Sequence, residues 1–147
     1  GQIRTATKRR KVFDHVRDSR GKFATVISPY SIISDTSCIN EGSIIFHNVL
    51  VNANTNIGRN VIINNKSLIE HDCIIGDHCH ISTGAILNGG CFIGNEVLIG
   101  SNSVVIQGIS IASNVIIGAG SVVIKDIKDP GVYAGNPVRK ISDDSNE

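Results

Sequence analysis

The feature that most constrains this chain is an aliphatic residue that recurs at every sixth position for almost one hundred residues. A period of six matches neither the 3.6-residue period of an α-helix nor the two-residue period of a half-buried strand. It is typical of a parallel β-helix, in which each hexapeptide supplies one short strand and one corner. The sequence therefore predicts an all-β fold. The seventeen anchors are Ile27, Ile33, Ile39, Ile45, Val51, Ile57, Ile63, Ile69, Ile75, Ile81, Leu87, Ile93, Ile99, Val105, Ile111, Ile117 and Val123.

Three hexapeptides close one triangular coil, so residues eighteen apart are expected to lie directly above one another. Neighbouring coils pair as parallel strands about 4.8 Å apart, and seventeen repeats then give between five and six coils in a prism about 27 Å long. The position four residues after each anchor is small or β-branched in nearly every repeat and is expected to face inward. The low aromatic content (4%) and the absence of Trp fit this narrow interior.

We expect three parts: a basic helix in residues 1–24, the β-helix in 25–128 and a C-terminal extension in 129–147. Residues 1–22 carry a net charge of +6 and the remainder −5. Val12, Phe13 and Val16 have helical spacing, which predicts one amphipathic helix packed on the end of the prism. A surface for phosphate groups is the alternative interpretation of its basic residues. Asp129-Pro130-Gly131 signals a turn, after which residues 132–141 are expected to pack back along the last coils, followed by a polar tail.

Three of the four cysteines, Cys73, Cys79 and Cys91, occupy the small inward position of the repeat. We interpret them as buried core residues and not as metal ligands or redox groups. The sequence contains no apolar run long enough to span a membrane and no signal peptide, so we expect a cytoplasmic protein.

His71 is the strongest candidate for chemistry, because Glu70 and Asp72 flank it at a predicted corner. Its stacked neighbours, Ala53 and Gly89, are small and are expected to leave open space over the imidazole. A histidine beside carboxylates suits a general base, since its pKa lies near neutrality and a carboxylate can fix its tautomer. The residues alone leave open the alternative of an exposed corner histidine without function.

Two further histidines, His78 and His80, raise the question of a shared metal. Carbonic anhydrases with a trimeric β-helix space two of their histidine ligands five residues apart. Here the separations from His71 are seven and nine residues, and His80 is expected across the prism from His71 within one subunit. We therefore predict no metal site.

The segment Ile63–Ala85 and the ending Gly131–Ile141 resemble a specific family, most clearly in the Glu-His-Asp corner at 70–72, in His80 and in the Ala-Gly-Asn-Pro sequence at 134–137. They are similar to the left-handed β-helix sugar O-/N-acetyltransferases related to sialic-acid O-acetyltransferase and the bacillosamine-pathway N-acetyltransferase. This resemblance implies a left-handed β-helix, acetyl-CoA as the co-substrate, and a homotrimer with each site between two subunits. Full-length relatives also carry an N-terminal Rossmann-like domain that holds the nucleotide-sugar, and residues 1–23 match its last helix.

The resemblance also implies the roles of individual residues. His71 would be the general base, oriented by Asp72, with Asn64 and Glu70 lining the acceptor pocket. The backbone N–H of Gly89 would stabilise the oxyanion that forms from the thioester. The remaining positions implied to contact the acetyl donor are His80, Gly100, Ala119, Ala134, Arg139 and Lys140.

We thus expect an acetyltransferase that acts on an amino sugar, nucleotide-linked, in bacterial surface-glycan synthesis. One alternative keeps this chemistry with a hydroxyl acceptor, as in sialic-acid O-acetylation. The other is a non-catalytic β-helix scaffold. A nucleic-acid partner is not expected, because only the N-terminal segment is basic and it contains one aromatic residue, Phe13. A membrane partner is not expected either.

Overall fold

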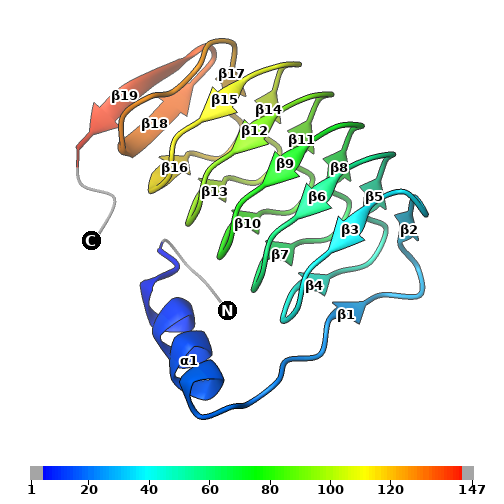
Figure 1. Ribbon diagram of the computed structural model, residues 1–147. Coiled ribbons are helices and arrows are strands. Elements are labelled where there is room, and N and C mark those ends of the chain that lie inside the picture. Colours follow the sequence, from blue (N-terminus) through cyan, green and yellow to red (C-terminus); the bar gives the residue numbers. More distant parts are fainter. Residues whose placement is uncertain (1–4, 144–147) are drawn as a thin grey trace.

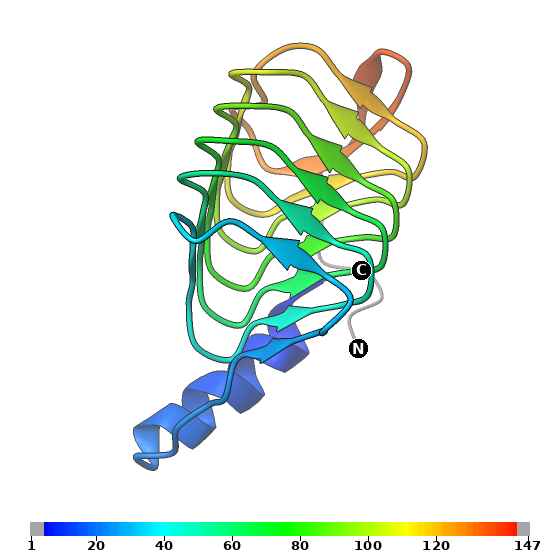
Figure 2. The same ribbon diagram turned by 90° about the vertical axis from the view of Figure 1, so that its right-hand side faces the viewer.

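The computed structural model describes residues 5–143 and contains one helix and nineteen strands in this range. The first seventeen strands wind into triangular coils, with one strand on each of three faces (Figures 1 and 2). Every one of these strands ends at one of the seventeen anchors, which confirms the β-helix. The six-residue period therefore determines both the positions of the strands and the number of coils.

Each face is a parallel sheet in which paired residues are eighteen apart, as in Ile45 opposite Ile63. Face A contains β1 (Val26–Ile27), β4 (Ile44–Ile45), β7 (Ile62–Ile63), β10 (His80–Ile81), β13 (Leu98–Ile99) and β16 (Val115–Ile117). Face B contains β2 (Ile32–Ile33), β5 (Leu50–Val51), β8 (Leu68–Ile69), β11 (Ile86–Leu87), β14 (Val104–Val105) and β17 (Val122–Val123). Face C contains β3 (Cys38–Ile39), β6 (Asn56–Ile57), β9 (Ile74–Ile75), β12 (Phe92–Ile93) and β15 (Ser110–Ile111).

The core is the axis of the prism, where the anchors from Ile45 onward are buried. The small residues four places after each anchor also face inward. Their polar groups are satisfied by carbonyls of the next coil: the Ser43 hydroxyl donates to Gly58 O (2.8 Å) and the Cys73 thiol to Asn88 O (3.2 Å). Cys73, Cys79 and Cys91 are buried free thiols, as predicted. Serine and cysteine are thus tolerated inside the prism because their polar groups find hydrogen-bond partners there.

The corners turn through residues with positive φ, a conformation that Asn, Asp and Gly adopt at the lowest cost. Asn54 (φ 58°) and Asp72 (φ 58°) are two examples from the corner that joins face B to face C. We call the three edges of the prism the A–B, B–C and C–A corners after the faces that they join. Most polar side chains lie at these corners, whereas the faces and the interior are largely aliphatic.

Helix α1 (Thr7–Asp18) lies along the C–A corner (Figure 1). Arg10 pairs with Glu96 and Arg17 with Glu41, so the helix spans several coils along the side of the prism. Phe13 stacks on Phe23 with ring centroids 4.3 Å apart and meets the edge of His78 at 5.5 Å. The expectation that the helix packs on the end of the prism is therefore wrong, because its partners are corner residues of successive coils.

The apolar face predicted for this helix is also narrower than expected. Phe13 is buried and Val16 is half-buried, but the side chain of Val12 is 63% exposed. The guanidinium of Arg9 instead turns toward the prism and donates to the carbonyls of Asn60 and His78. Polar contacts thus replace part of the expected hydrophobic docking.

The C-terminal extension adds two strands to face A. Strand β18 (Gly131–Gly135) runs parallel to β16, and β19 (Val138–Ser142) returns antiparallel to β18. The turn at Asp129–Gly131 ends the coils as predicted. The prediction that residues 132–141 pack back along the last coils is wrong, because they extend face A beyond the last coil. Residues 144–147 of the predicted tail lie outside the described part of the chain.

Candidate active site

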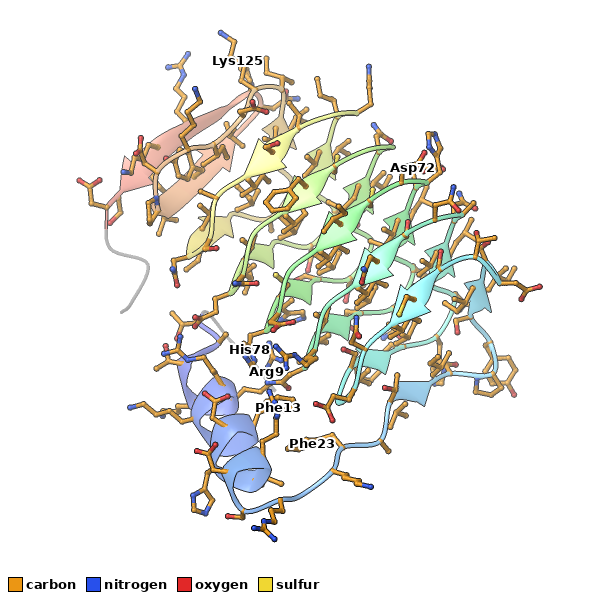
Figure 3. The ribbon with its side chains drawn as sticks, in the orientation of Figure 1. Arg9, Phe13, Phe23, Asp72, His78 and Lys125 are labelled. Carbon is orange, nitrogen blue, oxygen red and sulfur yellow. The ribbon has the colours of Figure 1, made fainter. Side chains whose placement is uncertain are left out.

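His71 and Asp72 form a hydrogen-bonded pair at the B–C corner, with His71 Nδ1 2.8 Å from Asp72 Oδ2. Both side chains are open to solvent, at 62% and 57% exposure. A carboxylate can only accept, so Nδ1 carries the shared proton and Nε2 of the neutral ring keeps its lone pair. Asp72 lies on the side of the prism away from helix α1 (Figure 3). This arrangement presents a proton-accepting nitrogen at the surface.

The backbone of this corner is fixed by the coils on either side. The N–H of Asp72 donates to Ala53 O (2.9 Å), and the N–H of Gly90 donates to His71 O (2.8 Å). The φ of 58° at Asp72 turns the chain sharply between strands β8 and β9. The pair therefore stands on a rigid scaffold, although its side chains are exposed.

Gly89 lies directly against the imidazole of His71. A Cβ at position 89 would be 2.7 Å from both Cε1 and Nε2 of the ring. The sequence predicted open space over the imidazole. Next to Gly89 that prediction is wrong, because the His71 ring occupies the space that a side chain at position 89 would fill. Among the described residues, the Gly89 N–H has no hydrogen-bond acceptor.

The hydrogen bond between the two side chains shifts both pKa values. It raises the pKa of His71 above its ordinary value, since Asp72 stabilises the imidazolium. It lowers the pKa of Asp72, with a smaller contribution from a hydrogen bond that Asn54 donates. Asp72 therefore stays ionised while His71 titrates, and a base with a raised pKa accepts a proton more strongly.

Of the two predicted acceptor-site residues, one lies beside His71 and one does not. Glu70 precedes His71 at the B–C corner, where Asn52 Nδ2 donates to Glu70 Oε2 (2.7 Å). Asn64 lies at the A–B corner, where its Oδ1 accepts from the N–H of Asn65 (2.8 Å). Face B separates these two corners, so one chain does not bring Asn64 to His71.

His80, predicted to contact the acetyl donor, points outward from β10 on face A and is only 8% exposed. Neither ring nitrogen has a hydrogen-bond partner among the described residues. Burial, with the nearby charge of Arg9, lowers the pKa of His80 to about 4. The ring is therefore neutral at pH 7, and both of its nitrogen atoms are buried.

The other predicted donor contacts gather along face A and the A–B corner. Gly100 and Ala119 lie at this corner on successive coils, and Ala134 of β18 follows them toward the C-terminal end. Arg139 and Lys140 are exposed on β19, where Lys140 pairs with Asp143. His71 and Gly89 thus lie at one edge of face B, and Gly100 and Ala119 lie at the other.

Face B itself carries one aliphatic side chain outward from every strand. Ile32 is 70% exposed and the other five are half-buried. No described helix covers this face, whereas α1 lies beside face A (Figure 1). The outward residues are Ile32, Leu50, Leu68, Ile86, Val104 and Val122.

The sequence interpretation missed two features of the corners. His78 is half-buried against Phe13 and hydrogen-bonded to Asn60. Asn54 contacts Asp72, and the eighteen-residue spacing between them is the signal that identifies this contact. No three metal-ligating side chains cluster within residues 5–143, and no helix of that range is long and apolar enough to cross a membrane.

Comparison with known proteins identifies the family of the repeats. The family described as bacterial transferase hexapeptide (six repeats) matches residues 54–89 and 90–125. The chain belongs to the hexapeptide-repeat transferases. The structure of PerB from Caulobacter crescentus, in complex with CoA and GDP-perosamine, is similar with a TM-score of 0.91 and 31% identity over 93% of this chain. The acetyltransferase domain of PglB from Neisseria gonorrhoeae, in complex with acetyl coenzyme A, is similar with a TM-score of 0.90 and 32% identity over 92%.

A GDP-perosamine N-acetyltransferase of Escherichia coli O157:H7 is 37% identical to this hexapeptide-repeat transferase over 64 residues, or 44% of the chain. The chain spans 66% of the length of each of the two solved proteins, and the matched segment is 29% of the E. coli protein. The fold of this hexapeptide-repeat transferase is the left-handed parallel β-helix of these acetyltransferases, as predicted.

Proposed function

We propose that this chain transfers an acetyl group from acetyl-CoA to the amino group of a nucleotide-linked amino sugar. The observation that carries the proposal is the exposed His71–Asp72 pair, which holds Nε2 as a proton acceptor beside the N–H of Gly89. The similarity to proteins whose structures contain acetyl-CoA or CoA, one of them together with GDP-perosamine, supports the donor and the class of acceptor.

The geometry suits direct transfer. The acceptor nitrogen attacks the thioester carbonyl, and His71 Nε2 takes the proton that this nitrogen must lose. The Gly89 N–H stabilises the negative charge that develops on the carbonyl oxygen. When the new C–N bond forms and the C–S bond breaks, CoA leaves as a thiolate that the His71 imidazolium can protonate. The three buried thiols are not nucleophiles in this scheme, since Cys73, Cys79 and Cys91 are enclosed in the core.

We further propose that the active form is a homotrimer with face B turned toward the threefold axis. A threefold arrangement would bring the A–B corner of one subunit to the B–C corner of the next. Asn64, Gly100 and Ala119 would then join His71 of the neighbouring subunit in one site. The uncovered aliphatic stripe of face B supports this arrangement, because a protein gains stability by removing such a surface from water.

The proposed cellular role is synthesis of a bacterial surface glycan in the cytoplasm, where acetyl-CoA and nucleotide-sugars are made. We assign no role in this reaction to the basic residues of α1 that pair with the prism. Arg139 and Lys140 at the far end of face A are proposed to contact the phosphates of the donor.

The experiment that tests the function combines calorimetry with an activity assay. Acetyl-CoA and CoA are titrated into protein whose mass has been determined by light scattering, and acetylation of GDP-perosamine and other nucleotide amino sugars is followed by mass spectrometry. We expect one donor site per subunit and a product heavier by one acetyl group. His71→Ala should bind the donor as before and form no product. A folded protein that binds neither acetyl-CoA nor CoA would contradict the proposal.

A hydroxyl acceptor is the second candidate, and the raised pKa of His71 is the observation that favours it. A neutral amine attacks a thioester without prior loss of a proton, whereas a hydroxyl needs a base at the start of the reaction. Treatment of the product with hydroxylamine distinguishes the two outcomes, because an ester is cleaved and an amide is not.

A further inference from the structure

Asn54 lies one coil before Asp72 in the same column of the B–C corner, eighteen residues earlier in the chain. Its Nδ2 donates to Asp72 Oδ1 (3.3 Å), while the other oxygen of the same carboxylate accepts from His71 Nδ1 (2.8 Å). The backbone of Asn54 is held in turn, because its N–H donates to Thr36 Oγ1 (3.0 Å) from the first coil. The carboxylate of Asp72 is therefore engaged on both sides.

The second contact matters because Asp72 is more than half exposed. An exposed carboxylate with one partner can rotate about its Cβ–Cγ bond and exchange that partner for water. His71 would then lose the group that keeps the proton on Nδ1. A neutral imidazole in water favours the proton on Nε2, and a ring in that form cannot accept a proton at Nε2.

We propose that Asn54 is a positioning residue for the catalytic base, acting through Asp72 to hold His71 in the tautomer that leaves Nε2 free to accept a proton. The catalytic part of this statement rests on the proposed function, in which His71 is the base. The tautomer itself is a property of the corner and can be tested without a substrate.

Few other groups influence the protonation of His71. The charged or titratable groups that influence it are Asp72, Glu70 and the thiol of Cys73. The coil before presents Ala53 and Asn54 at this corner, and the coil after presents Gly89 and Gly90, none of which carries a charge. Asp72 thus dominates, and Asn54 is the side chain that holds its second oxygen.

Two substitutions separate the role of the amide from the shape of the turn. Asn54→Gly removes the donor and suits the φ of 58°, since glycine adopts this conformation at no steric cost. Asn54→Asp keeps the shape and also tolerates positive φ, but it places an acceptor where the donor was. Asn114 provides the control, because it is an exposed asparagine with φ 61° on the C–A corner.

The test is nitrogen-15 NMR of the histidine rings, with His71 assigned by its loss in His71→Gln. We expect the Nδ1–H form in the wild type and a mixture with the Nε2–H form in both Asn54→Gly and Asn54→Asp. The pKa of His71 should fall toward its ordinary value in Asn54→Gly, because fewer molecules form the hydrogen bond to Asp72 that raises it. Asn114→Gly and Asn114→Asp should match the wild type. An unchanged His71 tautomer in either Asn54 variant would overturn the proposal.

Kinetics then connect the tautomer to turnover. We expect kcat for acetyl transfer to fall about tenfold in each Asn54 variant, by analogy with the loss of a group that orients a metal-bound histidine, with KM for acetyl-CoA unchanged. The two proposals fail in different ways. A wild-type chain that transfers no acetyl group contradicts the proposed function but does not change the NMR result. An active wild type whose His71 tautomer is the same in the Asn54 variants contradicts only the positioning role.

Discussion

The Cα of Gly89 lies so close to the imidazole of His71 that a methyl group at position 89 would overlap the ring edge that carries Nε2. The imidazole of the candidate base thus packs against the backbone of the following coil, and it fits there because Gly89 has no side chain. The same residue contributes the N–H that we assign to the oxyanion. In the proposed mechanism, one glycine thus sets both the orientation of the base and the position of the oxyanion.

Gly89→Ala is expected to displace the His71 ring and lower kcat by at least about tenfold, because a base that is misplaced by about 1 Å loses much of its effect. Donor binding, measured by calorimetry, should change little. Gly90→Ala is the matched control, since a Cβ at position 90 meets nothing within 4 Å and only its φ of 70° is unfavourable. A Gly89→Ala variant that kept the wild-type kcat would contradict the role of this contact.

The pH dependence of acetyl transfer should report the pair of His71 and Asp72. The base acts in its neutral form, so kcat/KM is expected to rise as the pH passes upward through the raised pKa of His71. Asp72→Asn removes the charge that stabilises the imidazolium, so the midpoint should move to lower pH while the plateau falls at least about tenfold. The profile is measured with acetyl-CoA well below its KM. A midpoint that stays in place would show that another group titrates.

The buried His80 should make the protein less stable in mild acid. Its pKa is about 4 in the folded state and about 6.5 when unfolded, so the unfolded chain binds the extra proton between these values. Stability is therefore expected to fall as the pH decreases from about 6.5 to about 4, by about 3 kcal/mol from this residue at the lower limit.

His80→Leu should remove most of this dependence, and it should not destabilise the protein at pH 7 because both ring nitrogens lack partners among the described residues. The measurement is urea unfolding at fixed protein concentration across this pH range, with His15→Leu on the exposed surface of α1 as the control. Burial also lowers the pKa of His78, so a small residual slope is expected in the variant.

Face B should be the surface through which subunits associate. Leu68→Asp places a charge at the centre of its aliphatic stripe and is expected to reduce the mass in light scattering from three times 15.7 kDa to that of one chain. Activity should be lost with assembly, because the proposed site combines two subunits. Asn56→Asp on exposed face C adds the same charge and should leave the trimer intact. Trimers that survive Leu68→Asp would place the interface elsewhere.

The β-helix was predictable from the sequence because one rule decides which residues are buried from Ile45 onward. An anchor such as Ile63 and its stacked partner Ile81 face the axis for the same reason, and no tertiary contact has to be guessed. The contact of Asn54 with Asp72 was equally accessible, since it follows from the same eighteen-residue register. Position in the coil thus determines which residues meet within the prism.

What packs against the outside of the prism did not follow from this rule. The period places His78 at a corner but does not indicate that Phe13 covers it. The docking of α1 depends on individual pairs such as Arg10 with Glu96, between segments with no shared periodicity. The prediction of open space beside His71 was wrong for a related reason. The small residue at position 89 leaves room, and the His71 ring fills it.

The uninterrupted coil of eighteen residues also determines which changes in length the chain can absorb. Loss or duplication of one whole coil would leave every later residue on its own face and shift it by about 4.8 Å along the axis. A change of six residues would preserve the buried anchors but rotate everything downstream by one face, so that the aliphatic stripe of face B would continue on another side. A change of one residue would turn the anchors outward from that point on. An internal change in length therefore leaves every later residue on its own face only when it is a multiple of eighteen residues.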